Sequence, residues 1–254
     1  MIGLLYSVLS YLGFLGVYCY FALFSDGLFV PKSVDSGQGA NLAVAFAVNA
    51  GLVLLFGLQH SVMARAGFKR ALTRVVPVHL ERATYVLATS VMLSAVMWLW
   101  QPMSGVVWHV ENAAWATPLW AVNALGWMGV PLCSFMIDHF DLFGLKQAFY
   151  GFRKRSVERS GFVTPLIYRY VRHPMMSSLF LAFWSTPYMS VGHLLLSVGM
   201  SLYIVIGVHF EERSLLRELG RPYEKYQAST PRFLPGRPRD TLTSDAAAAP
   251  VSGR

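Results

Sequence analysis

The chain has 254 residues, of which 55% are hydrophobic and only 13% are charged. Soluble domains carry about 25% charged residues, so this composition excludes an ordinary soluble fold and predicts a polytopic membrane protein. The formal charge of +8 would suit a nucleic-acid partner, but the Lys and Arg residues fall in short runs between apolar segments. We therefore expect membrane topology, and no nucleic acid, to account for the charge.

Four apolar runs have the length of about 20 residues that crosses a ~30 Å hydrocarbon core. They span residues 3–24, 41–63, 84–101 and 117–137. The N-terminus shows neither a basic region nor a small-residue cleavage site. We therefore expect the first run to be retained as a membrane helix rather than removed as a signal.

A fifth apolar stretch, residues 175–210, is too long for one crossing and short for two. Thr186-Pro187 through Gly192 lie near its middle and form a turn signal. The sequence thus predicts an all-α, polytopic integral membrane bundle of five to six transmembrane passes. It includes a tight C-terminal helical hairpin followed by short cytoplasmic helices; five spans is the main alternative to six.

The basic residues indicate which loops face the cytoplasm, because loops rich in Lys and Arg stay on that side. Connection 102–116 has neither Lys nor Arg, whereas the connections on either side of it and the region after the last apolar stretch have many. The clustered residues are Arg65, Lys69, Arg70, Arg74 and Arg82, then Lys146, Arg153, Lys154, Arg155, Arg159, Arg169 and Arg172, and then Arg213, Arg217, Arg221 and Lys225. This alternation favours six passes with both termini cytoplasmic.

Residues 1–235 are expected to form a single membrane domain, with a C-terminal half at about 160–235. From Pro235 onward a mixture of Gly, Pro, Ala, Ser and Thr can bury little apolar surface. We therefore predict a disordered tail over residues 236–254.

Two clusters of charge flank the hairpin stretch. Arg172, His173 and Pro174 precede it, and Glu211 and Glu212 follow it. Because burying charge in lipid is costly, paired clusters at both ends of an apolar hairpin indicate a site at the membrane face. The simpler interpretation is that the arginine anchors the helix to the cytoplasmic side, the histidine caps it, and the carboxylates form ion pairs or face solvent.

The order of these motifs is more specific than any one of them. After the two glutamates come Leu-Gly-x-x-Tyr-x-x-Tyr, ending at Tyr226, and Pro-Arg-x-Leu-Pro, beginning at Pro231. Together with Arg-His-Pro, this arrangement resembles the C-terminal half of the isoprenylcysteine carboxyl methyltransferase superfamily of membrane enzymes. The resemblance covers roughly residues 160–235.

The N-terminal half resembles a narrower group. Residues 58–65, 81–85 and 138–147 are similar to the bacterial methanethiol S-methyltransferase group and its relatives in the NnrU-like family. The resemblance implies methyl transfer from S-adenosylmethionine to methanethiol, giving dimethyl sulfide and S-adenosylhomocysteine. It also implies an active site at the cytoplasmic face of a bacterial inner membrane.

Carried over position by position, the resemblance places cofactor-binding segments on a defined set of residues. These are Phe162, Val163, Tyr168, His173, Pro174 and Glu211, to which we add Tyr223 and Arg172, whose guanidinium suits the cofactor carboxylate. No arginine lies one turn before Glu211, where prenylcysteine enzymes place a substrate-binding one. That departure counts against a prenylated protein as the acceptor.

A thiol attacks as thiolate, and an alkyl thiol with a pKa at or above ~8.5 is mostly protonated at neutral pH. We expect His173, or a carboxylate among Glu211, Glu212 and Asp138, to accept the thiol proton. We take His173, Glu211 and Glu212 as the catalytic residues. His60 and His139 are expected to make polar contacts at helix ends rather than to bind a metal.

Two other functions stay open. A methyltransferase of a lipid or of a prenylcysteine-like substrate would share this C-terminal layout. A non-catalytic NnrU-like membrane protein would share the N-terminal motifs without binding S-adenosylmethionine. The sequence does not indicate an oligomeric state.

Overall fold

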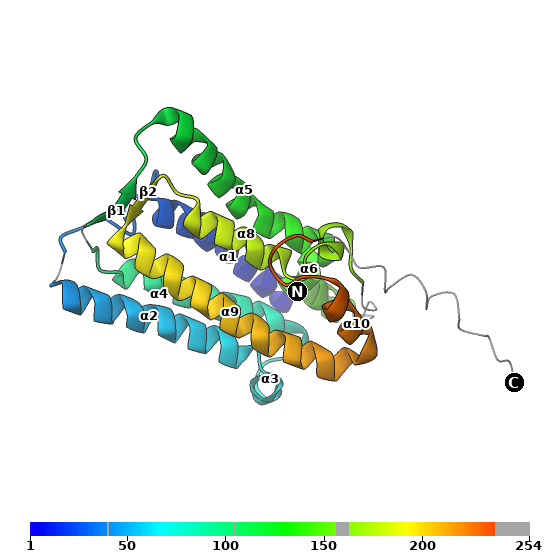
Figure 1. The fold of residues 1–254 in the computed structure, drawn as a ribbon. Coiled ribbons are helices and arrows are strands. Elements are labelled where there is room, and N and C mark those ends of the chain that lie inside the picture. Colours follow the sequence, from blue (N-terminus) through cyan, green and yellow to red (C-terminus); the bar gives the residue numbers. More distant parts are fainter. Residues whose placement is uncertain (40, 104, 156–162, 237–254) are drawn as a thin grey trace, which may run out of the picture.

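The computed structural model describes residues 1–39, 41–103, 105–155 and 163–236. It is a bundle of helices along one axis, with two short strands at one end and the short helices at the other (Figure 1). In chain order the elements are α1 (Ile2–Asp26), α2 (Leu42–Met63), α3 (Ala66–Leu72), η1 (Val78–Leu80), α4 (Glu81–Leu99), β1 (Val106–His109), α5 (Ala113–Ile137), α6 (His139–Leu142), α7 (Leu145–Phe152), η2 (Leu166–Arg169), α8 (Pro174–Trp184), β2 (Tyr188–Ser190), α9 (Val191–Leu219) and α10 (Arg221–Ser229).

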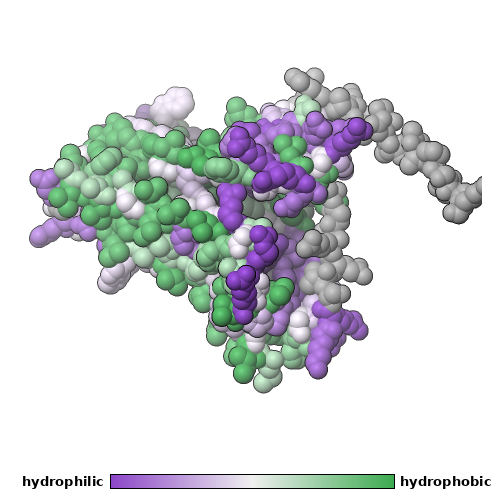
Figure 2. All heavy atoms as spheres, turned by 90° about the horizontal axis from the view of Figure 1, so that it is seen from below, coloured by the Kyte–Doolittle hydropathy of each residue, from purple (hydrophilic) through white to green (hydrophobic). Residues whose placement is uncertain are grey.

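Among the described residues, five helices are long and apolar enough to cross a membrane: α1, α2, η1 with α4, α5 and α9. Their outer faces carry large apolar side chains; Leu54, Leu125 and Leu202 are 73%, 64% and 58% exposed. Hydrophobic side chains cover much of the face in Figure 2, and hydrophilic ones gather toward one end. Apolar surface of this extent is what a bilayer covers. The prediction of an all-α integral membrane bundle is confirmed.

The C-terminal hairpin is less symmetrical than expected. Its first arm, α8, has 11 residues and spans only about 16 Å. Thr186-Pro187 stops the helix, because proline lacks an amide donor and disfavours helix at the residue before it. The chain then continues as β2, which pairs antiparallel with β1 through Val106↔Ser190 and His109↔Tyr188.

This strand completes a sixth traverse of the bundle. His173, just before α8, lies beside the segment that follows α10, whereas β2 lies with β1 at the opposite end (Figure 1). The chain therefore passes along the bundle six times, five times as a long helix and once as a short helix plus a strand. The N-terminus and the end of α10 consequently lie at the same end.

The second arm, α9, runs to Leu219 rather than ending near residue 210. Its 29 residues span about 43 Å, more than the ~30 Å hydrocarbon core. Glu211 and Glu212 thus lie in the last turns of a continuous helix that extends beyond the core. The helix ends at Gly220, whose positive φ of 62° is one that glycine tolerates, and α10 follows directly.

Glycines allow the central helices to pack closely. A Cβ atom on Gly126 of α5 would lie 2.8 Å from the Cα atom of Ala182 in α8. In the α2–α9 pair, a Cβ atom on Gly57 would lie 2.8 Å from Cδ2 of Tyr203, and one on Gly199 would lie 2.8 Å from Cγ1 of Val53. Small residues at helix contacts let backbones approach and gain van der Waals energy where lipid offers no hydrophobic drive.

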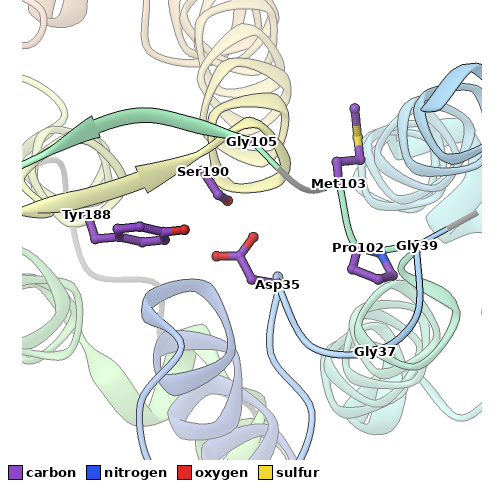
Figure 3. A pocket seen from close by; sticks show the side chains of 8 residues that line it. All are labelled: Asp35, Gly37, Gly39, Pro102, Met103, Gly105, Tyr188 and Ser190. Carbon is purple, nitrogen blue, oxygen red and sulfur yellow. The ribbon is translucent and has the colours of Figure 1, made fainter.

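A pocket of about 190 Å³ opens at the β1–β2 end, where Asp35 points between Tyr188 and Ser190 (Figure 3). Burial raises the pKa of Asp35, and its hydrogen bond with Ser190 partly offsets this. This pocket lies at the opposite end of the bundle from Glu211 and His173. We therefore do not assign it to the candidate active site.

Candidate active site

The C-terminal segment folds back onto the start of α8. The backbone N–H of Arg172 donates to the carbonyl of Pro231 at 2.9 Å, and that of His173 donates to the carbonyl of Arg232 at 3.1 Å. Pro174 occupies the first turn of α8, where its missing N–H costs nothing. These contacts bring the Arg-His-Pro and Pro-Arg-x-Leu-Pro motifs side by side, although the motifs lie far apart in the chain.

Glu212 is the centre of a buried ion cluster. Its side chain is 3% exposed and accepts hydrogen bonds from Arg172 Nε at 2.8 Å and Arg232 Nη2 at 2.6 Å. His173 Nε2 lies 3.1 Å from the first carboxylate oxygen, and Gln227 Nε2 donates to the second at 3.2 Å. Both oxygens are therefore fully occupied by positive or donor groups.

The side chain of Arg172 is likewise buried and fully engaged in hydrogen bonds. Its side chain is 7% exposed, and besides Glu212 it donates to the backbone carbonyls of Gln227, at 2.8 Å, and Thr230. The guanidinium that we expected beside the cofactor carboxylate thus holds α8, α9 and the segment after α10 together.

Glu211 has a different environment from its neighbour. Its side chain is 51% exposed, and His173 Nδ1 lies 3.8 Å from its Oε2. Because consecutive helical residues point about 100° apart, Glu212 faces the arginines, while Glu211 points to a different side of α9, next to Nδ1 of His173. His173, which is 8% exposed, bridges the two carboxylates.

Tyrosines from four elements interact electrostatically with Glu211. The hydroxyls of Tyr85 in α4, Tyr168 in η2, Tyr203 in α9 and Tyr223 in α10 all lie within electrostatic range of its carboxylate. The site is therefore assembled by the fold from segments that are far apart in the chain.

The tyrosines on the short helices are fixed and uncharged. The Tyr226 hydroxyl donates to the carbonyl of Tyr168 at 2.6 Å, and Tyr223 is 2% exposed. Burial raises the pKa of Tyr168 and Tyr223 and raises that of Tyr226 to about 12. All three phenols are consequently neutral at physiological pH and present rings and hydroxyls rather than charge.

The structure brings most of the predicted site residues to one end of the bundle: Tyr168, Arg172, His173, Pro174, Glu211, Glu212 and Tyr223. Val163 is 63% exposed in the segment that leads to η2. Phe162 lies outside the described residues.

A second polar cluster borders Glu211 and was not among the predicted site residues. The Tyr85 hydroxyl lies 2.6 Å from His60 Nε2, and His60 Nδ1 lies 3.1 Å from the Thr89 hydroxyl. The ring of Tyr203 packs edge-on against His60, with ring centres 5.9 Å apart. In the sequence, His60 and Tyr85 lie within the stretches 58–65 and 81–85 that carry the family resemblance. Their contact with Tyr203 could not be predicted, because it depends on how α2, α4 and α9 pack.

The groups near His139 make structural contacts. His139 is 4% exposed; its Nε2 lies 2.7 Å from the Tyr11 hydroxyl and its Nδ1 lies 2.6 Å from the Ser134 hydroxyl. Lys146 donates to Asp138, and this bond lowers the pKa of the carboxyl below its ordinary value. These contacts tie the end of α5 to α1 and α7, as expected for polar contacts at helix ends.

Comparison with known proteins identifies relatives over almost the whole chain. The chain is 44% identical over 238 residues to a methanethiol S-methyltransferase of Mycobacterium tuberculosis, covering 94% of this chain and 98% of the relative. It is 44% identical over 243 residues to a methanethiol S-methyltransferase of Pseudomonas deceptionensis, covering 96% and 93%.

A more distant relative comes from an animal. The chain is 31% identical over 166 residues to nurim of Xenopus laevis, covering 62% of this chain and 58% of the relative. No family model and no solved structure matches the chain. The long and nearly complete matches to bacterial enzymes place this chain in the methanethiol S-methyltransferase family.

Proposed function

We propose that this chain transfers a methyl group from S-adenosylmethionine to methanethiol, producing dimethyl sulfide and S-adenosylhomocysteine. Several relatives at 40–44% identity carry the name methanethiol S-methyltransferase. The single structural observation that carries the proposal is the half-exposed carboxylate of Glu211 beside the buried His173.

The donor set around Glu211 fits a sulfonium cofactor. A carboxylate and neutral aromatic rings attract a cation, and cation–π attraction contributes about 0.5–2 kcal/mol. The half-buried Tyr168 would hold the cofactor next to Glu211, with His173 at the base of the site. Tyr223, expected to bind the cofactor, is 2% exposed, so we assign it to support the site from behind. Arg172 is bound to Glu212, so we assign it to positioning His173 and the C-terminal segment rather than to the cofactor carboxylate.

When bound, the cofactor supplies an electrophilic methyl group: a bond forms between this carbon and the thiol sulfur, the methyl–sulfonium bond breaks, and its electron pair stays on the donor sulfur. Holding both reactants in line is worth up to ~7–11 kcal/mol. The fixed tyrosines and the six-pass bundle suit such an orienting role.

We infer that a group of this chain accepts the thiol proton, and the geometry favours Glu211. Glu212 already accepts hydrogen bonds from two arginines, and Asp138 is paired with Lys146; protonating either would break an ion pair. Glu211 is half exposed, and its carboxylate lies 3.8 Å from Nδ1 of His173. We therefore assign Glu211 as the proton acceptor and His173 as the group that orients it.

The charge distribution supports a cytoplasmic site. The arginines and lysines of the α2–α4 connection and of the region after α9 lie at the same end of the bundle as Glu211 (Figure 1). Positive charge marks the cytoplasmic side. We propose that both termini and the active site face the cytoplasm, in the inner membrane of a bacterium, with the described part of residues 1–235 acting as one domain.

Glu211→Gln tests this assignment, with Glu218→Gln, an exposed residue of the same helix, as the matched control. Loss of a positioned general base lowers kcat by about 10²–10⁴-fold. We expect that loss for Glu211→Gln at pH 7, measured as dimethyl sulfide by headspace gas chromatography, with the control at the parent rate.

The pH dependence separates a base from a structural residue. Without the base, the rate should follow the ionised fraction of the thiol and rise about tenfold per pH unit up to the thiol pKa. A Glu211→Gln variant with the parent rate at pH 7, or with a reduced rate that does not rise with pH, contradicts the assignment.

A further inference from the structure

The face of α9 that carries Glu211 also carries Gly207, which has no side chain and leaves open space beside the helix. Tyr203, Gly207 and Glu211 follow one another at intervals of one helical turn, so they share this face. Gly207 lies midway, roughly 6 Å along the axis from each neighbour. A Cβ atom added to Gly207 would meet no described atom within 4 Å, apart from its own helix and chain neighbours.

The two flanking residues show that this face turns toward the protein. Tyr203 packs on Gly57 of α2, where an added Cβ would lie 2.8 Å from its ring. Glu211 faces His173 at the start of α8. The open space over Gly207 therefore lies beside the contact between α9 and α2 at one end and the candidate active site at the other.

Tyr85 of α4 and His60 of α2 form a polar cluster beside Tyr203. The Tyr85 hydroxyl lies 2.6 Å from His60 Nε2, and the His60 ring packs edge-on against Tyr203 with ring centres 5.9 Å apart. Along α9 the space thus lies between the Tyr203 ring, which packs on this cluster, and the Glu211 carboxylate.

We propose that this space, the Gly207 hollow, binds the acceptor thiol and limits the size of the thiols that the protein accepts. The proposal rests on the proposed function and adds to it the acceptor's place and the residues that limit its length. The thiol group would point to Glu211 and the methyl group would lie over Gly207 against Tyr203. A one-carbon thiol fits between the two flanking residues, whereas a long chain meets the Tyr203 ring, which is packed against α2.

Gly207→Leu fills the hollow, and Gly51→Leu in α2 is the matched control because a Cβ there also meets no described atom within 4 Å. Leucine is a better helix former than glycine by up to about 1 kcal/mol, so neither change should unfold its helix. For Gly207→Leu we expect KM for methanethiol to rise at least tenfold, or turnover to be lost, with S-adenosylmethionine binding in detergent within threefold of the parent. Gly51→Leu should keep the parent KM.

Tyr203→Ala tests the size limit in the opposite direction. Removing the ring should raise kcat/KM for butanethiol relative to methanethiol by at least tenfold. Parent-like KM in Gly207→Leu, or an unchanged preference in Tyr203→Ala, overturns the proposal.

A labelling experiment tests the Gly207 hollow independently of enzyme activity. It is needed if the parent makes no dimethyl sulfide, a result that would refute the proposed function. In a Cys19→Ser background, Gly207→Cys should react with methyl methanethiosulfonate, which places a methylthio group in the hollow, at least tenfold faster than Gly51→Cys. Equal or slower labelling at residue 207 overturns the hollow as a seat for a small thiol group.

Discussion

Replacing Glu212 by glutamine tests how the candidate site is held together. The substitution preserves the shape of the side chain and removes one negative charge from a group that is 3% exposed. Arg172, 7% exposed, would then remain buried without its carboxylate. The change isolates charge from packing because no cavity is created.

The expected cost follows from the burial of both partners. Removing one member of a buried ion pair destabilises a protein by about 3–5 kcal/mol, since the other charge is left uncompensated. For a chain of this size, each kcal/mol shifts Tm by about 2–4 °C. Glu212→Gln should therefore melt roughly 6–20 °C below the parent.

Thermal unfolding in detergent, followed by intrinsic tryptophan fluorescence, measures this shift. Glu211→Gln is the matched comparison, because its side chain is half exposed and an exposed ion pair contributes about 0–1 kcal/mol. We expect Glu211→Gln to melt within a few degrees of the parent. A Glu212→Gln variant with the parent Tm would refute the view that this carboxylate anchors the site.

Three further outcomes are expected. Gly126→Leu should destabilise the α5–α8 contact, because a Cβ atom there would lie 2.8 Å from the Cα atom of Ala182. The yield of folded protein on size-exclusion chromatography should fall. The control Gly13→Leu should elute like the parent, because a Cβ atom at Gly13 meets no described atom within 4 Å. Isothermal titration of the purified protein in detergent should show S-adenosylmethionine binding, and a flat titration would favour a non-catalytic membrane protein. In a panel of acceptors, methanethiol should be methylated and a farnesylated cysteine should not, whereas the reverse preference would favour a prenylcysteine methyltransferase.

The membrane helices could be predicted from the sequence because length and apolar composition determine them. The expected spans 41–63 and 117–137 correspond to α2 (Leu42–Met63) and α5 (Ala113–Ile137). The conformation of the hairpin was harder to predict, because Thr186-Pro187 signals a break in the helix without indicating the conformation of the residues that follow. Its first arm ends in a strand because β1, from a distant part of the chain, supplies a partner.

The site shows a similar limit. The motifs predicted that His173 and the two glutamates lie together, and the structure places His173 within 3.8 Å of Glu211 and 3.1 Å of Glu212. The different roles of the two glutamates depend on the rotation of α9 and on Arg232, which returns to Glu212 from 20 residues later. The contribution of His60, Tyr85 and Tyr203 depends on how three helices pack, and no local pattern encodes it.

The most direct test of the proposed function follows the methyl group itself. Purified protein in detergent would be incubated with methanethiol and S-adenosylmethionine carrying a deuterated methyl group, and the headspace analysed by mass spectrometry. We predict dimethyl sulfide with one deuterated methyl group per molecule, in amounts equal to the S-adenosylhomocysteine released. Dimethyl sulfide without the label, or no product from protein that binds the cofactor, would contradict the account.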